Sequence, residues 1–126
     1  MPELDQVQDW IDGYIRAWNS NDADDIRRLF TNDAAYYTEP FSAPWRGQEA
    51  IVASWLARQD EPGQTEFTWS PLVITDTLAV VQGQTTYLNP PRIYSNLWII
   101  RLDSTGRCFE FTEWWMEQPS DTRAPG

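Results

Sequence analysis

Glu113 is the residue of this sequence best placed to do chemistry. It interrupts an apolar stripe of alternating residues in the segment 107–117, where Phe109, Phe111 and Trp115 share its face. A carboxylate taken out of water must be paired, hydrogen-bonded or neutralised by a raised pKa, and a raised pKa suits a general acid or base near neutral pH. The pattern leaves open catalysis, an internal ion pair with an arginine, hydrogen bonds to Trp and Tyr side chains, or a place at the wet rim of a sheet.

Glu39 and Tyr14 are the other two candidates for a catalytic role. Glu39 directly precedes Pro40, at the exit of an expected strand into a loop, where functional side chains are common. Tyr14 lies four residues from both Trp10 and Trp18 on one helical ridge. A phenol that faces a cavity can stabilise a developing enolate. The alternative for Glu39 is an exposed carboxylate beside a turn proline, and the alternative for Tyr14 is a core tyrosine.

Aromatic residues and a few polar ones predict a pocket for a small hydrophobic molecule. Asn96 and Trp98 alternate on one face of the segment 93–102, and an asparagine can orient a carbonyl because it both donates and accepts hydrogen bonds. An aromatic wall with few polar groups is typical of such a site, although aromatic packing without a void is the alternative. The predicted ligand-binding residues are Trp18, Tyr37, Trp55, Asn96, Trp98, Phe111 and Trp115.

The composition excludes several mechanisms. The chain has 126 residues, enough for about one domain, with no histidine, no lysine and one cysteine. Without an imidazole there is no Ser-His-Asp or Cys-His catalysis and no histidine-ligated zinc site. Without a lysine there is no P-loop or Schiff-base chemistry, and a single cysteine excludes an internal disulfide. We therefore expect no cofactor and no metal.

The charge balance argues against nucleic acid and anionic membranes as partners. The formal net charge is −10 at pH 7, and the nine arginines are scattered along the sequence. No apolar run approaches the roughly 20 residues of a transmembrane span, and the N-terminus lacks the features of a signal peptide. We expect a cytoplasmic protein.

The periodicity predicts helices first and strands afterwards. One apolar stripe marks a helix over 4–19, and Asn21 or Asp22 caps a short second helix that extends to Phe30. These elements predict an α+β fold, in which three helices pack in a strongly curved, mostly antiparallel sheet to form a cone over 1–118, followed by a flexible tail, 119–126. The remaining expected elements are a turn at 31–33, a strand at 34–38, a helix at about 48–59, and strands at 65–75, 78–88, 93–102 and 107–117.

Four motifs in order resemble the nuclear transport factor 2-like superfamily, in its SnoaL-like and ketosteroid isomerase-like branch. The resemblance covers residues 4–117. It rests on YIRAWNSND (14–22), IRRLFTNDA (26–34), RGQEAI (46–51) and the closing hairpin from LDSTGR (102–107) to EWW (113–115).

The resemblance implies roles for three positions. Tyr14 matches the oxyanion-hole tyrosine of the ketosteroid isomerases, and Glu39 matches the catalytic aspartate that precedes a proline, with one extra residue before Pro40. The protonated aspartic acid of that family falls near Trp98, whose indole donates a hydrogen bond but is not an acid.

The opposite face of the sheet carries exposed apolar side chains. Leu97, Ile99 and Trp114 would face outward on a lone cone, and such a patch marks an interface. The resemblance implies a homodimer through this face. Gln82 and Gln84 face either the cavity or the dimer surface.

Two functions stay open at this stage. One is cofactor-free acid–base isomerase, lyase or cyclase chemistry on a small hydrophobic carbonyl compound. The other is a non-catalytic module for ligand binding or dimerisation.

Overall fold

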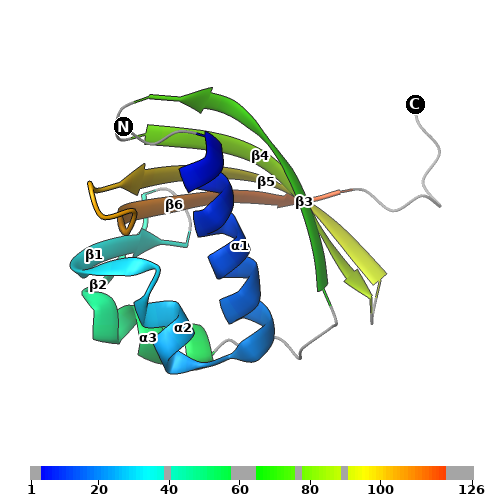
Figure 1. The fold of residues 1–126 in the computed structure, drawn as a ribbon. Helices are drawn as coiled ribbons and strands as arrows, with labels where there is room; N and C mark the ends of the chain where they lie inside the picture. The colour runs from blue at the N-terminus through cyan, green and yellow to red at the C-terminus, as the bar shows by residue number, and fades with distance from the viewer. Residues whose placement is uncertain (1–3, 39–40, 58–64, 76–77, 89–90, 119–126) are drawn as a thin grey trace, which may run out of the picture.

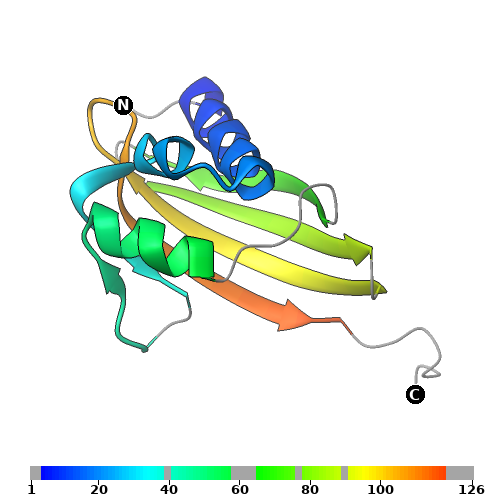
Figure 2. The same cartoon turned by 90° about the horizontal axis from the view of Figure 1, so that it is seen from below.

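Three helices and one six-stranded sheet make up the described part of the chain. The computed structural model describes residues 4–38, 41–57, 65–75, 78–88 and 91–118. The helices lie on one face of the curved sheet, as Figure 1 and Figure 2 show. This confirms the expected α+β class. The helices are α1 (Leu4–Ser20), α2 (Ala23–Arg27) and α3 (Gln48–Ala57), and the strands are β1 (Phe30–Tyr37), β2 (Trp45–Arg46), β3 (Thr65–Ile74), β4 (Leu78–Leu88), β5 (Pro91–Leu102) and β6 (Cys108–Glu117).

The sheet is mixed, with the strand order β2-β1-β6-β5-β4-β3. The strands β3 to β6 form an antiparallel meander that runs from the far edge back to β1, so β6 meets β1 in parallel. The hairpin of β5 and β6 was expected from the short polar loop between them. The meander matters for function because it places the inner faces of β4, β5 and β6 side by side beneath the helices.

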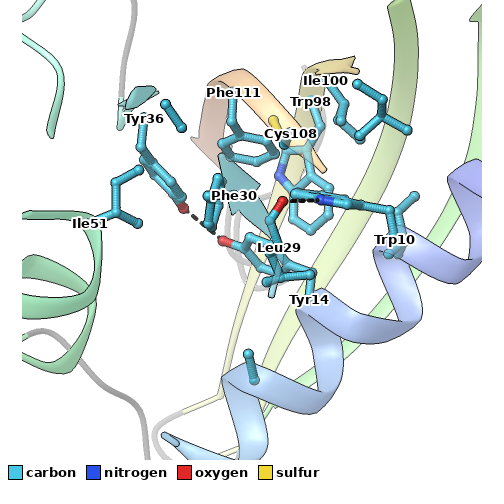
Figure 3. Packing of buried hydrophobic residues seen from close by; sticks show 14 of the residues in the cluster. Trp10, Tyr14, Leu29, Phe30, Tyr36, Ile51, Trp98, Ile100, Cys108 and Phe111 are labelled. Atoms are coloured by element: carbon cyan, nitrogen blue, oxygen red, sulfur yellow. Dashed lines mark hydrogen bonds between the residues drawn. The ribbon is translucent and has the colours of Figure 1, made fainter. Parts of the chain in front are cut away.

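The aromatic face of α1 anchors the helix against the sheet. Trp10 and Tyr14 are buried, and the indole N–H of Trp10 donates to the backbone oxygen of Leu29 at 2.9 Å (Figure 3). The Tyr14 ring packs on Trp98 and Phe111, with ring centroids 4.6 and 5.7 Å away. Burial of such large apolar surfaces is the main stabilising contribution of α1. It also brings the Tyr14 hydroxyl to the inner face of the sheet.

The short second helix begins as expected but ends early. The Asp22 side chain caps α2 by accepting from the backbone N–H groups of Asp24 and Asp25, at 2.8 and 3.4 Å. The prediction that this helix extends to Phe30 is wrong, because Phe30 opens β1 and is the register partner of Cys108.

The prediction of a turn at 31–33 is also wrong. The prediction that side chains alternate between the two faces along the whole last strand is wrong too. The turn-forming residues 31–33 lie inside β1, whose register with β6 shifts between Phe30 and Ala35. On β6, Leu102 is opposite Cys108 and Arg101 is opposite Glu110, so Phe109 is the extra residue of a bulge. The bulge leaves Phe109 37% exposed and buries Cys108 instead, which corrects the inward position predicted for Phe109.

The outer face of the sheet is covered by none of the three helices (Figure 2). Gln82 and Gln84 are exposed there, opposite Leu97 and Ser95 of β5. The two glutamines therefore do not face the cavity. Among the described residues, no helix is both long and apolar enough to span a bilayer.

Candidate ligand and acid-base site

A pocket of about 340 Å³ lies between the helices and the inner faces of β4, β5 and β6. Most of its wall is aromatic, and Glu113 is the only charged side chain among its described lining residues. A concave, largely apolar site with a few polar groups is the usual form of a small-molecule site. The lining residues are Tyr14, Trp18, Tyr36, Thr38, Trp45, Trp55, Thr85, Tyr87, Tyr94, Asn96, Trp98, Glu113 and Trp115.

The Glu113 carboxylate is held by two neutral donors from β5. The Asn96 amide Nδ2 donates to Oε2 at 2.8 Å, and the indole nitrogen of Trp98, its direct cross-strand partner, donates to the same oxygen at 3.3 Å. The Thr85 hydroxyl donates to Oδ1 of Asn96 at 2.7 Å. Because Thr85 occupies the amide oxygen, the amide NH₂ group of Asn96 is turned toward Glu113.

This environment makes Glu113 suited to proton transfer near neutral pH. Burial raises the pKa of Glu113 to about 7, although the hydrogen bonds from Trp98 and Asn96 favour the ionised form. The ion pairs between described residues join Arg27, Arg28 and Arg101 to other carboxylates and do not include Glu113. The alternative of an internal ion pair is therefore not met within the described ranges, whereas the alternative of a hydrogen bond from a tryptophan is met by Trp98.

Two tyrosine hydroxyls meet at the helical side of the pocket. The hydroxyl oxygens of Tyr14 and Tyr36 are 2.7 Å apart (Figure 3). Burial raises the pKa of both phenols well above the usual 10, and the nearby charge of Glu113 raises them further. Both therefore stay protonated at neutral pH. Since only one of the two donates within the pair, the other hydroxyl proton can be donated to a ligand oxygen.

The structure brings most of the predicted site residues together. Phe111 is fully buried and packs under the Tyr14 ring instead of lining the pocket. Tyr37 is half-buried on β1 and is not among the lining residues, whereas its neighbour Tyr36 is. Glu39 lies outside the described residues. The predicted residues that line the pocket are Tyr14, Trp18, Trp55, Asn96, Trp98, Glu113 and Trp115.

Several lining residues escaped the sequence prediction. Tyr36 was missed because the turn expected at 31–33 obscured which residues of the following strand face inward. The alternation of side chains along a strand could have identified Tyr94, Thr85 and Tyr87 as lining residues. Tyr94 lies two residues before Asn96, and Thr85 and Tyr87 share a face of β4. Within the described ranges, no three His, Cys, Asp or Glu side chains gather as metal ligands.

Comparison with known proteins identifies the family. A model of the SnoaL-like domain matches residues 11–117. No curated protein matches the chain. Many solved structures match the chain, and three of them illustrate the similarity in fold. An NTF-2-like protein of unknown function from Burkholderia xenovorans LB400 has a TM-score of 0.72 at 15% identity, over 97% of this chain and 89% of that one.

The other two similar structures support the same fold. A protein of unknown function with a cystatin-like fold from Methylobium petroleophilum PM1 has a TM-score of 0.71 at 16% identity, over 98% of this chain and 84% of that one. A ketosteroid isomerase-like protein from Kribbella flavida DSM 17836 has a TM-score of 0.67 at 18% identity, over 97% of this chain and 84% of that one. The expected nuclear transport factor 2-like fold is thus confirmed. Because the domain model spans most of the sequence, the chain belongs to the SnoaL-like family.

Proposed function

We propose that the pocket binds a small, largely hydrophobic carbonyl compound and moves a proton on it without a cofactor, as an isomerase, lyase or cyclase does. One observation carries the proposal. The Glu113 carboxyl lies in an aromatic pocket with a pKa of about 7 and is held by the neutral donors Asn96 and Trp98. A carboxyl in this state exchanges a proton readily at neutral pH.

The arrangement assigns a role to each polar group. Both donors reach Oε2 of Glu113, and no described residue donates to Oε1, so Oε1 is the atom that takes the proton. The C–H bond next to the substrate carbonyl breaks, its electron pair forms the enolate, and Oε1 becomes protonated. A hydroxyl of the Tyr14–Tyr36 pair donates to the enolate oxygen. Glu113 then returns the proton to carbon. Glu39 remains a predicted second carboxylate.

Exchange of carbon-bound protons in D₂O tests the proposal without a known substrate. A panel of enolisable ketones is followed by NMR with the wild-type protein, with Glu113→Gln and with Glu110→Gln. Glu110 lies on the same strand and pairs with Arg101, so its substitution is the matched control. We expect exchange with the wild type and the control but not with Glu113→Gln. Equal exchange in all three proteins contradicts the role of Glu113. A further Glu39→Gln variant tests the second carboxylate.

Ligand binding without catalysis is the second candidate function. It is favoured by the resemblance to the ketosteroid isomerases, by which their protonated aspartic acid falls near Trp98, a residue that donates a hydrogen bond but is not an acid. Under this function, hydrophobic ligands quench tryptophan fluorescence saturably and no ketone in the panel exchanges protons. If the wild type exchanges ketone protons and Glu113→Gln abolishes this exchange, binding without catalysis is excluded.

We also propose a homodimer through the outer face of the sheet. Trp114 and Met116 of β6 and Val73 of β3 are exposed there, together with half-buried Leu97 and Ile99. Light scattering after size exclusion is expected to give about twice the 14.7 kDa mass of the chain. A monomer mass at micromolar concentration contradicts the dimer.

A further inference from the structure

The sheet side of the pocket is built in two layers. Tyr87, Tyr94 and Trp115 stand near the ends of β4, β5 and β6 and form the outer layer, which we call the aromatic rim. Thr85, Asn96 and Glu113 each lie two residues further into the same strand on the same face and form the polar layer. Two residues span roughly 6.6 Å of a strand, so a small ligand touches both layers at once.

The rings of the aromatic rim contact one another edge to face and do not stack. The Tyr87 and Tyr94 rings are inclined at 78° with centroids 5.5 Å apart, and the Tyr94 and Trp115 rings are inclined at 64° with centroids 5.8 Å apart. Rings at such angles present faces in different directions. Trp115 keeps 54% of its surface exposed.

Among the described lining residues, the only formal charge is the negative charge of Glu113 when it is ionised. None of the described arginines lines the pocket. The chain contains no lysine or histidine and carries a net charge of −10. The faces of aromatic rings are also negative, because their π electrons form a quadrupole. Such a pocket attracts cations and repels anions.

We infer that the ligand of this pocket carries an organic cation, a protonated amine or a quaternary ammonium group, seated between the aromatic rim and the Glu113 carboxylate. The inference rests on the proposed function only in taking the same pocket as the ligand site, and it requires no turnover. A cation within about 6 Å of a ring centroid is attracted to the ring face. Asn96, which donates to Glu113 and is the cross-strand partner of Trp115, places the carboxylate next to that rim.

Binding of a cation is coupled to ionisation of Glu113. Among the described lining residues, the other titratable groups are the phenols of Tyr14 on α1, Tyr36 on β1, Tyr87 on β4 and Tyr94 on β5. Burial holds the pKa of the Tyr14 and Tyr36 phenols well above its usual value, whereas the pKa of Glu113 is about 7, so Glu113 changes charge between pH 5.5 and 8. The affinity for a cation therefore rises over this range, whereas the affinity for a neutral ligand does not.

Calorimetric titration with three ligands of one shape tests the inference. The ligands are choline, the neutral 3,3-dimethylbutan-1-ol and the anionic 3,3-dimethylbutyrate. At pH 8 we expect choline to bind about tenfold more tightly than the alcohol and the carboxylate to bind least. The Kd of choline is expected to fall about tenfold from pH 5.5 to 8. A Kd for the alcohol as low as that for choline overturns the inference, as does the absence of binding by all three.

Variants separate the carboxylate from the rim. Glu113→Gln is expected to remove the pH dependence, and Trp115→Leu is expected to weaken choline binding while the pH dependence remains. The matched control Glu110→Gln is expected to bind choline as the wild type does. A pH dependence of choline binding that survives Glu113→Gln overturns the inference. If the wild type exchanges ketone protons but does not prefer choline, the inference of a cationic ligand is rejected and the proposed function stands. If the wild type prefers choline but exchanges no ketone protons, only the proposed acid–base function is rejected.

Discussion

The carboxylate of Glu113 accepts a 2.8 Å hydrogen bond from the Asn96 amide across the β5–β6 pair, and the direction of that bond is fixed from a third strand. The Thr85 hydroxyl on β4 donates to the amide oxygen at 2.7 Å. Both Thr85 and Asn96 are buried. A buried polar chain of this kind is rigid because each member lacks an alternative partner in water. The acid–base group is thus oriented by the sheet itself.

The first prediction concerns how stability depends on pH. The folded pKa of Glu113, about 7, is higher than the usual unfolded value of about 4.3. The folded state therefore binds the proton more tightly, and stability is lost as the pH rises from about 4.3 to 7. Since one pKa unit corresponds to about 1.4 kcal/mol, the loss is on the order of 3–4 kcal/mol. Glu113→Gln is expected to remove it.

The sequence makes this measurement unusually clean. The chain has no histidine, so no other side chain with an ordinary pKa titrates between pH 6 and 8. The free energy of unfolding in urea, measured from pH 5 to 8 for the wild type and Glu113→Gln, gives the contribution of Glu113 as a difference. A difference that stays constant over this range contradicts the raised pKa.

The second prediction concerns Thr85. Thr85→Val keeps the shape of the side chain but removes the donor to Asn96, so Asn96 is no longer held with its NH₂ group toward Glu113. The pKa of Glu113 is expected to rise, and the free energy of unfolding to fall by about 1–3 kcal/mol. Thr85→Ser restores the hydroxyl and is expected to restore the pKa. Thr86→Val, on the opposite face, is the control. The pH dependence of ketone exchange or choline binding reports the pKa, and an unshifted profile in Thr85→Val rejects the positioning role.

The third prediction concerns the two phenols. Tyr14→Phe and Tyr36→Phe each break the 2.7 Å hydrogen bond, and each leaves the remaining hydroxyl to serve the ligand alone. If the pair stabilises an enolate, the double variant is expected to lose about 10²-fold in exchange rate. The exchange rate of each single variant is expected to fall by less than about tenfold, because the remaining hydroxyl still donates to the enolate. The NMR exchange assay measures all three rates. A double variant as active as the wild type removes the pair from the mechanism.

The sequence predicted the elements better than their local irregularities. Helical spacing of apolar residues located α1, and the capping signal of Asp22 located the start of α2. Two of the errors, at residues 31–33 and at Phe109, have one physical origin. Both fall where β1 and β6 change register, and an extra residue there moves side chains to the other face. Nothing in the local sequence marks such a shift, because the pairing partner fixes it.

The site was predicted in part for a similar reason. Asn96, Trp98 and Glu113 were placed together because strand alternation is reliable away from bulges. Thr85, in contrast, is an ordinary strand residue whose role depends on the diagonal contact between β4 and β5. The hydrogen bonds from Thr85 to Asn96 and from Asn96 to Glu113 link three strands of the assembled sheet. They could therefore be recognised only in the structure.

The last prediction concerns Gly83, which keeps the stacking under the pocket in place. A Cβ atom at Gly83 would lie 2.5 Å from the Phe67 ring, and that ring stacks on Trp98 with centroids 4.4 Å apart. Gly83→Ala is therefore expected to push Phe67 against Trp98 and to weaken the donor that Trp98 offers Glu113. We expect a loss of about 1–3 kcal/mol in the free energy of unfolding and a changed tryptophan emission spectrum. The exposed neighbour Gln82→Ala is the control. Gly83→Ala with the stability and emission of the wild type contradicts the close approach of the Phe67 ring.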